Sequence, residues 1–197
     1  MSKALNHKLV LLGIAGLLSC LVLGLIAPGG LDAARHSPHF ISAIKLAERI
    51  KNRESIQVID LRDSVAYAEF NIPRSRRLSI AQALAAPMEG DRVYYSGQDL
   101  LARKLWASLP DSVRARSYVL HGGIEAWYQQ VLHPTLPRKP RGEDRPLVQH
   151  LNALIQFYGG EATFTEDSTV LDVYRVNLSN APWPKTQLVT GEMRKGC

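Results

Sequence analysis

Three short apolar segments that alternate with helical patterns limit this chain of 197 residues to folds built on a parallel sheet. The segments are IQVID (56–60), RVYYS (92–96) and SYVL (117–120). The first is a continuous apolar run of the kind that is buried on both faces in a parallel sheet. Strands and helices follow one another at α/β spacing, which predicts one parallel sheet with helices on both faces.

The helical patterns between these strands are amphipathic and end at recognisable stop signals. Ser42 is predicted to cap a helix in which Ile44, Ala47 and Ile50 share one face. Pro110 ends the helix that follows RVYYS, and the Gly159–Gly160 pair ends a helix near the C-terminus. A short strand is predicted over 170–176. We expect helices over about residues 42–50, 65–70, 97–109, 124–131 and 147–158.

An uncharged run of 19 residues, Leu9–Ala27, precedes these elements. As a helix it would be about 28 Å long, close to the thickness of the hydrocarbon core of a bilayer. Lys3 and Lys8 precede it, so we expect a single transmembrane helix with the N-terminus in the cytoplasm. Two alternatives remain open, a cleaved signal peptide and a lipoprotein processed at Cys20.

The chain is therefore expected to have six parts. They are a cytoplasmic N-terminus (1–8), a transmembrane helix (9–27), a linker (28–39), an α/β domain (40–133), a basic linker rich in proline (134–146) and a C-terminal helix with an extension (147–197).

Composition excludes several classes of function. The net charge of +6 is too small and too scattered to indicate nucleic-acid binding. Cys20 and Cys197 are the two cysteines, which excludes a disulfide scaffold and a cysteine-based zinc site. His36 and His39 are interpreted as surface or linker histidines and not as metal ligands. We predict neither a metal nor a cofactor.

Two local motifs resemble those of a known family. VIDLRDSVAYAEFNIP (58–73) resembles the first core strand, the Asp-x-Arg turn and the Ile-Pro loop of rhodanese-like domains, and HGGIEAW (121–127) resembles their closing signature. The resemblance covers residues 40–132, about half of the chain. It implies a rhodanese-like α/β fold. The residues of this signature are interpreted as structural ones: Asp60, Arg62, Gly122, Gly123 and Trp127.

The family's catalytic cysteine is missing. The resemblance implies that active members carry it at the end of the strand equivalent to 92–96, before a loop that binds an anion through backbone N–H groups. Here the segment is YYSGQDLLARK (94–104), in which neither Tyr95 nor Ser96 can carry a sulfane sulfur. Ser96 and Asp99 resemble a capping box around Gly97, so we expect a helix to begin where the anion would bind. Asp99 would also place a negative charge there.

Three arginines follow the Ile-Pro motif, at positions 74, 76 and 77. They replace the small residues that the resemblance implies after that motif. One interpretation is a solvated loop. The functional interpretation is that Arg74, Arg76 and Arg77 form a binding patch for anionic lipid headgroups or for an acidic partner surface.

The predicted function is that of a membrane-anchored, non-catalytic rhodanese-like subunit that binds or supports a partner. Its partners would be membrane lipid, through residues 9–27, and another membrane protein or complex, and not nucleic acid. The domain would lie on the periplasmic side of the inner membrane. The alternative is a sulfur carrier or sulfurtransferase in which Cys197 supplies the thiol. A third class, a receptor for a small anion without turnover, would require an open loop after Tyr95.

Overall fold

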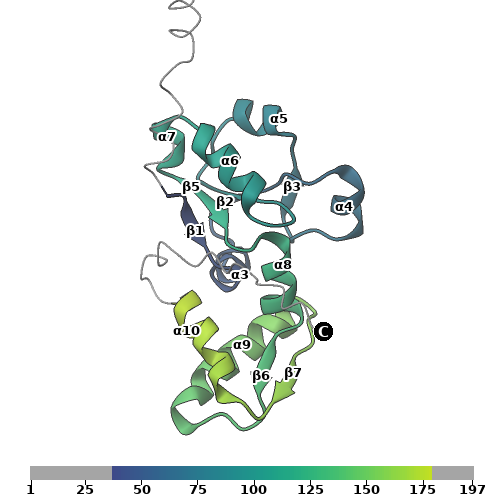
Figure 1. Ribbon diagram of the computed structural model, residues 1–197, viewed down its shortest axis with the longest axis vertical. Helices are drawn as coiled ribbons and strands as arrows, with labels where there is room; N and C mark the ends of the chain where they lie inside the picture. The colour runs from purple at the N-terminus through teal and green to yellow at the C-terminus, as the bar shows by residue number, and fades with distance from the viewer. Residues whose placement is uncertain (1–36, 179–197) are drawn as a thin grey trace, which may run out of the picture. The chain divides into compact units, whose positions relative to one another are not determined.

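A five-stranded parallel sheet forms the centre of the computed structural model, which describes residues 37–178 (Figure 1). The strands lie in the order β1-β5-β4-β2-β3, and all four pairings are parallel. Their bounds are β1 (His39–Ile41), β2 (Ile56–Asp60), β3 (Ser75–Arg77), β4 (Asp91–Tyr95) and β5 (Ser117–Leu120). The strands expected at 56–60, 92–96 and 117–120 are the three central ones, and the two edge strands are additional.

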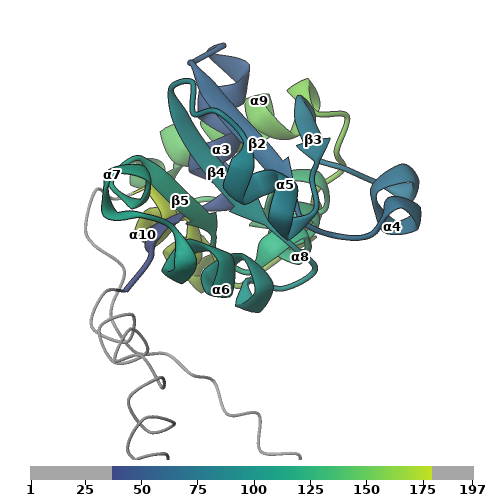
Figure 2. The same ribbon diagram turned by 90° about the horizontal axis from the view of Figure 1, so that it is seen from above.

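Helices cover both faces of this sheet, as predicted (Figures 1 and 2). Successive residues of a strand point to opposite faces. Val58 and Val93 accordingly belong to the core that includes α3 and α8, whereas Ile59 and Tyr94 contact α5 and α6. The helices of the domain are α3 (Ala43–Lys51), α4 (Ser64–Glu69), α5 (Ile80–Ala85), α6 (Leu100–Ser108), α7 (Asp111–Arg114) and α8 (Gly123–Trp127), which continues as the π-helical turn η2 (Tyr128–Leu132).

The chain beyond residue 133 folds against the domain. Its elements are β6 (Thr135–Pro137), η3 (Gly142–Asp144), α9 (Arg145–Phe157), β7 (Thr163–Thr165), η4 (Ser168–Val170) and α10 (Leu171–Leu178). The expected linker 134–146 thus contains a strand, which pairs with β7, and a 3-10 turn. The strand predicted over 170–176 is wrong: this segment is helical, because the buried Leu171 and Tyr174 are three residues apart on one helix face.

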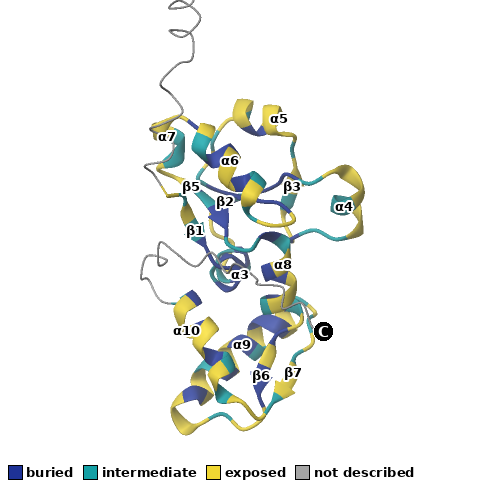
Figure 3. Ribbon diagram, in the orientation of Figure 1, coloured by how far each residue is buried: buried dark blue, intermediate teal, exposed yellow. Residues whose placement is uncertain are grey.

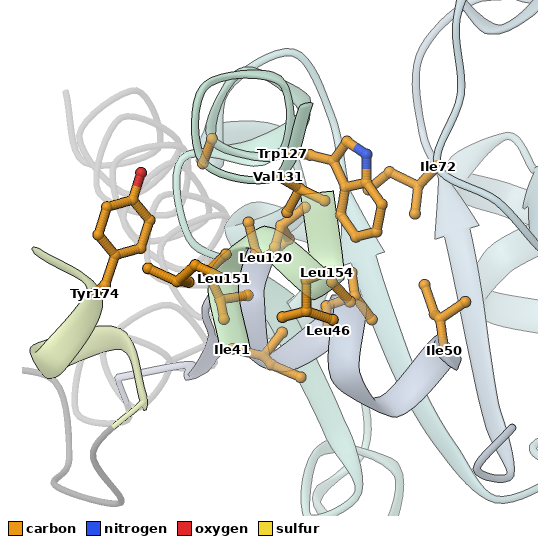
Figure 4. Close-up of a cluster of buried hydrophobic side chains, with 14 of the residues drawn as sticks. Ile41, Leu46, Ile50, Ile72, Leu120, Trp127, Val131, Leu151, Leu154 and Tyr174 are labelled. Carbon is orange, nitrogen blue, oxygen red and sulfur yellow. The ribbon is translucent and has the colours of Figure 1, made fainter. Parts of the chain in front are cut away.

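One hydrophobic core joins the domain and this C-terminal part. Leu151 and Leu154 of α9 belong to the same cluster of buried side chains as Leu46 of α3 and Trp127 (Figure 4). Two long-range hydrogen bonds support the packing: the Ser42 hydroxyl donates to the Asn177 carbonyl at 2.9 Å, and the Tyr158 hydroxyl donates to the Ala47 carbonyl at 2.6 Å. Figure 3 shows the central strands and the inward faces of α3 and α9 buried, with the outer faces of the helices exposed. Residues 134–178, which we call the C-terminal layer, are therefore an integral part of the fold.

The predicted fold class needs one correction. No helix within residues 37–178 is long and apolar enough to cross a membrane. The longest of them, α9, has 13 residues, or about 20 Å, which is shorter than the hydrocarbon core of a bilayer. The fold class that the structure supports is therefore an α/β fold with a parallel sheet flanked by helices, without the expected transmembrane helix. The segment 9–27 itself lies outside the described residues.

Candidate functional site

The turn after β2 is held by a buried ion pair. The Asp60 side chain is fully buried, and its carboxylate accepts hydrogen bonds from the Arg62 guanidinium at 2.6 and 3.1 Å and from the Arg62 backbone N–H at 2.8 Å. The guanidinium also donates to the Phe70 carbonyl at 2.5 Å. Burial lowers the pKa of Arg62, but the hydrogen bonds to Asp60 and its charge raise it by more. Arg62 therefore stays charged, and its positive charge faces Asp60 instead of an open site.

Tyr95 ends β4 at the position where the resemblance implies a catalytic cysteine. Its hydroxyl donates to the Ser75 hydroxyl at 3.0 Å and accepts from the Ile72 N–H at 3.2 Å. The side chain is fully buried, with the Arg62 guanidinium 5.7 Å from the ring centroid. Burial raises the pKa of the Tyr95 hydroxyl, although these hydrogen bonds oppose the shift. The group therefore stays neutral and fixes the segment before β3.

The loop after Tyr95 differs from the capping box that the sequence predicts. Ser96 is buried, and its hydroxyl donates to the Gln98 carbonyl. Helix α6 begins at Leu100, with Asp99 as its N-cap residue and no side-chain capping bond. The predicted Ser96–Asp99 box is wrong, because the Ser96 hydroxyl binds the Gln98 carbonyl instead of the Asp99 N–H. The backbone carbonyl of Ser96 accepts a hydrogen bond from the Ile124 N–H at 3.0 Å.

The two glycines of the closing motif explain why this loop lies so close to α8. Gly122 and Gly123 have φ angles of 70° and 61°, which glycine adopts without strain. A Cβ on Gly123 would lie 2.5 Å from the Ser96 carbonyl oxygen and 2.7 Å from the Gly97 carbonyl oxygen. Gly123 is thus required for the contact between α8 and the loop 96–98, as the sequence interpretation of a structural glycine implies.

Trp127 lies between the domain and the C-terminal layer. It is fully buried, and its ring meets the Tyr158 ring edge to face at 5.1 Å between centroids. Its indole N–H has no hydrogen-bond partner. The tryptophan packs α8 onto the core, as expected, but much of its surroundings comes from α9 and not from the sheet alone.

The three arginines that follow the Ile-Pro motif do not form one patch. Arg76 and Arg77 are exposed on β3, and successive strand residues point to opposite faces. Arg74 precedes the strand, and its guanidinium lies 3.5 Å from the Ile50 carbonyl at the end of α3. The structure places Arg74 beside α3 and α9, separate from the other two.

Sequence reasoning missed a cavity of about 450 Å³ beside Arg74. Its walls come from the end of α3, from the segment before β3 and from the end of α9. The lining residues are Ile50, Lys51, Arg53, Pro73, Arg74, Phe157 and Tyr158. No local pattern relates residues 157–158 to residues 50–53, so only the excess of arginine and lysine at these turns could have drawn attention to them.

Two further predictions concern cysteines and metals. Cys20 and Cys197 lie outside the described residues. Within 37–178 there is no group of three or more His, Cys, Asp and Glu side chains that could hold a metal ion.

Comparisons with known proteins return structural neighbours alone, since no protein-family model and no curated protein matches the chain. A protein of unknown function from Rhodopseudomonas palustris, described as a possible tyrosine phosphatase, is 18% identical, with 49% of this chain and 84% of that one covered and a TM-score of 0.43. A rhodanese-like domain from Anabaena is 19% identical (47% and 74% covered, TM-score 0.40). A rhodanese-like domain protein from Staphylococcus aureus is 16% identical (45% and 90% covered, TM-score 0.39).

Rhodanese-like domains are thus among the structures to which this chain is similar. Its own topology is that of an α/β fold, with a parallel sheet flanked by helices.

Proposed function

We propose that this protein is a non-catalytic binding module with a rhodanese-like fold. The observation that carries the proposal is the state of the two residues at the end of β4. The hydroxyl groups of Tyr95 and Ser96 are both buried and both hydrogen-bonded inside the protein. Neither is available to attack a substrate.

The chemistry of the family supports the same conclusion. Sulfur transfer and cysteine-dependent phosphate hydrolysis both need a thiolate, because a hydroxyl neither carries a sulfane sulfur nor ionises near neutral pH without an activating base. The Ser96 hydroxyl donates a hydrogen bond to the Gln98 carbonyl oxygen, and a backbone carbonyl does not act as a general base. Arg62, whose guanidinium lies 5.7 Å from the centroid of the Tyr95 ring, is already paired with Asp60.

The proposal is tested by looking for turnover with the full chain. Thiosulfate with cyanide tests sulfur transfer, and para-nitrophenyl phosphate tests phosphate hydrolysis. We expect no thiocyanate and no nitrophenolate above the rate without protein. Turnover that disappears in a Ser96→Ala variant would overturn the proposal.

Intact mass spectrometry after incubation with thiosulfate tests the sulfur-carrier alternative. A gain of one sulfur atom that is absent from a Cys197→Ser variant would identify the tail thiol as the active group and would also overturn the proposal. An unchanged mass supports a fold that binds without chemistry.

A further inference from the structure

The cavity beside Arg74 and the loop 96–99 lie at opposite ends of the parallel strands. Arg53 comes just before β2 and Arg74 just before β3, and these strands are parallel. The cavity is therefore at the amino ends of the strands, whereas Tyr95 marks the carboxyl end of β4. Two of its walls, Phe157 and Tyr158, belong to the C-terminal layer. A domain that ended at residue 133 would not have this cavity.

Among residues 37–178, the positive charge that lines the cavity has no acidic ion-pair partner. Lys51, Arg53 and Arg74 line the cavity, and within residues 37–178 none of the three makes an ion pair. Arg49, one turn earlier on α3, shows the contrast, since it pairs with Glu54 at 2.7 Å and with Asp91 at 2.8 Å. Three unpaired cations around one hollow form a site for an anion.

The backbone conformation at residue 53 favours glycine, so local structure does not explain why an arginine is found there. The Arg53 N–H donates to the Ile50 carbonyl at 3.1 Å, and the Glu54 N–H donates to the Arg49 carbonyl at 3.0 Å. This pair of bonds is a Schellman motif, in which the residue equivalent to Arg53 is left-handed and is most often glycine.

Arg53 and Arg74, with φ angles of 56° and 65°, are the two non-glycine residues within 37–178 that have left-handed backbone. Both are arginines, and both line the same cavity. Strained residues of this kind cluster at binding sites, where the side chain has a use that outweighs the strain.

The remaining walls are apolar and partly aromatic. Ile50 and Pro73 lie beside Phe157 and Tyr158, and the Lys51 ammonium is 5.5 Å from the centroid of the Phe157 ring. The Tyr158 hydroxyl donates to the Ala47 carbonyl. Burial raises the pKa of this hydroxyl to about 12, so it adds no negative charge to the cavity near neutral pH. The volume is that of a site for a small organic molecule and is larger than a bare inorganic anion needs.

We propose that this cavity binds a small organic anion, a molecule with a phosphate or carboxylate group on an aromatic body. The anionic group is held by Arg53 and Arg74, whose planar guanidinium groups suit bidentate contacts with either head group. The aromatic body packs against Phe157 and Tyr158, with Lys51 at the rim. This names a site and a ligand class for the binding function proposed above, on which it rests.

Isothermal titration calorimetry of the full chain tests the proposal with four probes. Phenyl phosphate and benzoate carry both parts of the ligand, inorganic phosphate carries the head group alone, and benzyl alcohol carries the body alone. We expect phenyl phosphate or benzoate to bind one to one, at least about tenfold more tightly than inorganic phosphate or benzyl alcohol. Inorganic phosphate binding as tightly as phenyl phosphate would overturn the proposal.

Matched double variants locate the site. Arg53→Gln with Arg74→Gln should weaken binding of the preferred probe at least about tenfold. Arg76→Gln with Arg77→Gln removes the same charge from exposed positions on β3 and should leave the affinity within about twofold. Equal losses in the two variants would mean general attraction of anions, and no loss in the first would place binding elsewhere. Either result would overturn the proposal.

Recovery of the probe separates this inference from the proposed function. Phenyl phosphate that is bound and released unchanged supports both. Bound phenyl phosphate that is hydrolysed would refute the non-catalytic function and keep the ligand site. No binding together with no turnover in the assays above would refute the ligand site alone.

Discussion

The two ends of the parallel sheet use arginine in opposite ways. At the carboxyl end, Arg62 is directed inward, paired with the buried Asp60 and bonded to the Phe70 carbonyl. At the amino end, Arg53 and Arg74 have strained backbones and no ion pair within residues 37–178. Where every polar group is satisfied, a residue stabilises the fold. Where a charged side chain has no ion-pair partner and lines a cavity, binding of a ligand explains its presence better than stability does.

The largest expected effect concerns the carboxyl end. Replacing Asp60 with alanine leaves the Arg62 guanidinium without its buried partner and removes an acceptor for the Arg62 N–H. Breaking such a pair should lower the free energy of unfolding by about 3–5 kcal/mol, measured by urea denaturation. The double variant Asp60→Ala, Arg62→Ala should be less destabilised than the sum of the two single variants. A loss below about 1 kcal/mol for Asp60→Ala would show that the pair does not hold this end of the sheet.

The second prediction tests whether the C-terminal layer belongs to the same core. Leu151 of α9 is 1% exposed. Its replacement by alanine should lower the free energy of unfolding by about 2–5 kcal/mol, with a single transition for domain and extension. Val173 on α10 is 52% exposed, and Val173→Ala should change stability by about 0.5 kcal/mol or less. Two separate transitions would mean that the amino-end cavity is formed by two independent units.

The sequence predicts this fold best where the signals are local. The segments 56–60 and 117–120 form strands with the predicted bounds, and Ser42 caps α3 by accepting from the Lys45 N–H at 3.2 Å. The edge strands β1 and β3 have three residues each, too few for a periodic pattern to be recognised. β3 consists of Ser-Arg-Arg, whose strand conformation depends on pairing with β2.

The candidate sites depend on contacts that no local pattern contains. The Ser96–Asp99 pattern fits a capping box, yet the loop is shaped by the Ile124 N–H and by the close approach of Gly123, about 27 residues later in the chain. The cavity requires three segments that are distant in sequence, around residues 53, 74 and 158. Motifs could therefore predict structural roles for Asp60, Arg62 and Gly123, but neither the loop after Tyr95 nor the cavity at the amino end.

The third prediction concerns alkaline pH and the C-terminal layer. Burial raises the pKa of Tyr174 to about 12 from the ordinary value of 10.0. Between these values the unfolded chain loses the phenolic proton while the folded protein keeps it, so stability falls as the pH rises from 10 to 12. Urea denaturation at pH 9 and pH 11 should show a smaller decrease for Tyr174→Phe than for the wild type. The exposed Tyr128 gives the matched control: if Tyr128→Phe reduces the pH dependence equally, burial of Tyr174 is not the cause.

The smallest expected effect has the opposite sign and sharpens the comparison between the two ends. Because Arg53 occupies a left-handed position that favours glycine, Arg53→Gly should increase the free energy of unfolding by about 1 kcal/mol and raise the thermal midpoint. Arg76→Gly removes the same side chain from β3, where glycine is unfavourable, and should decrease stability by about 0.5–1 kcal/mol. A decrease for both variants would show that the Arg53 side chain itself stabilises the fold, as Arg62 does. An increase for Arg53→Gly, together with weaker binding of phenyl phosphate, would show that the arginine is present at the expense of stability because of what it binds.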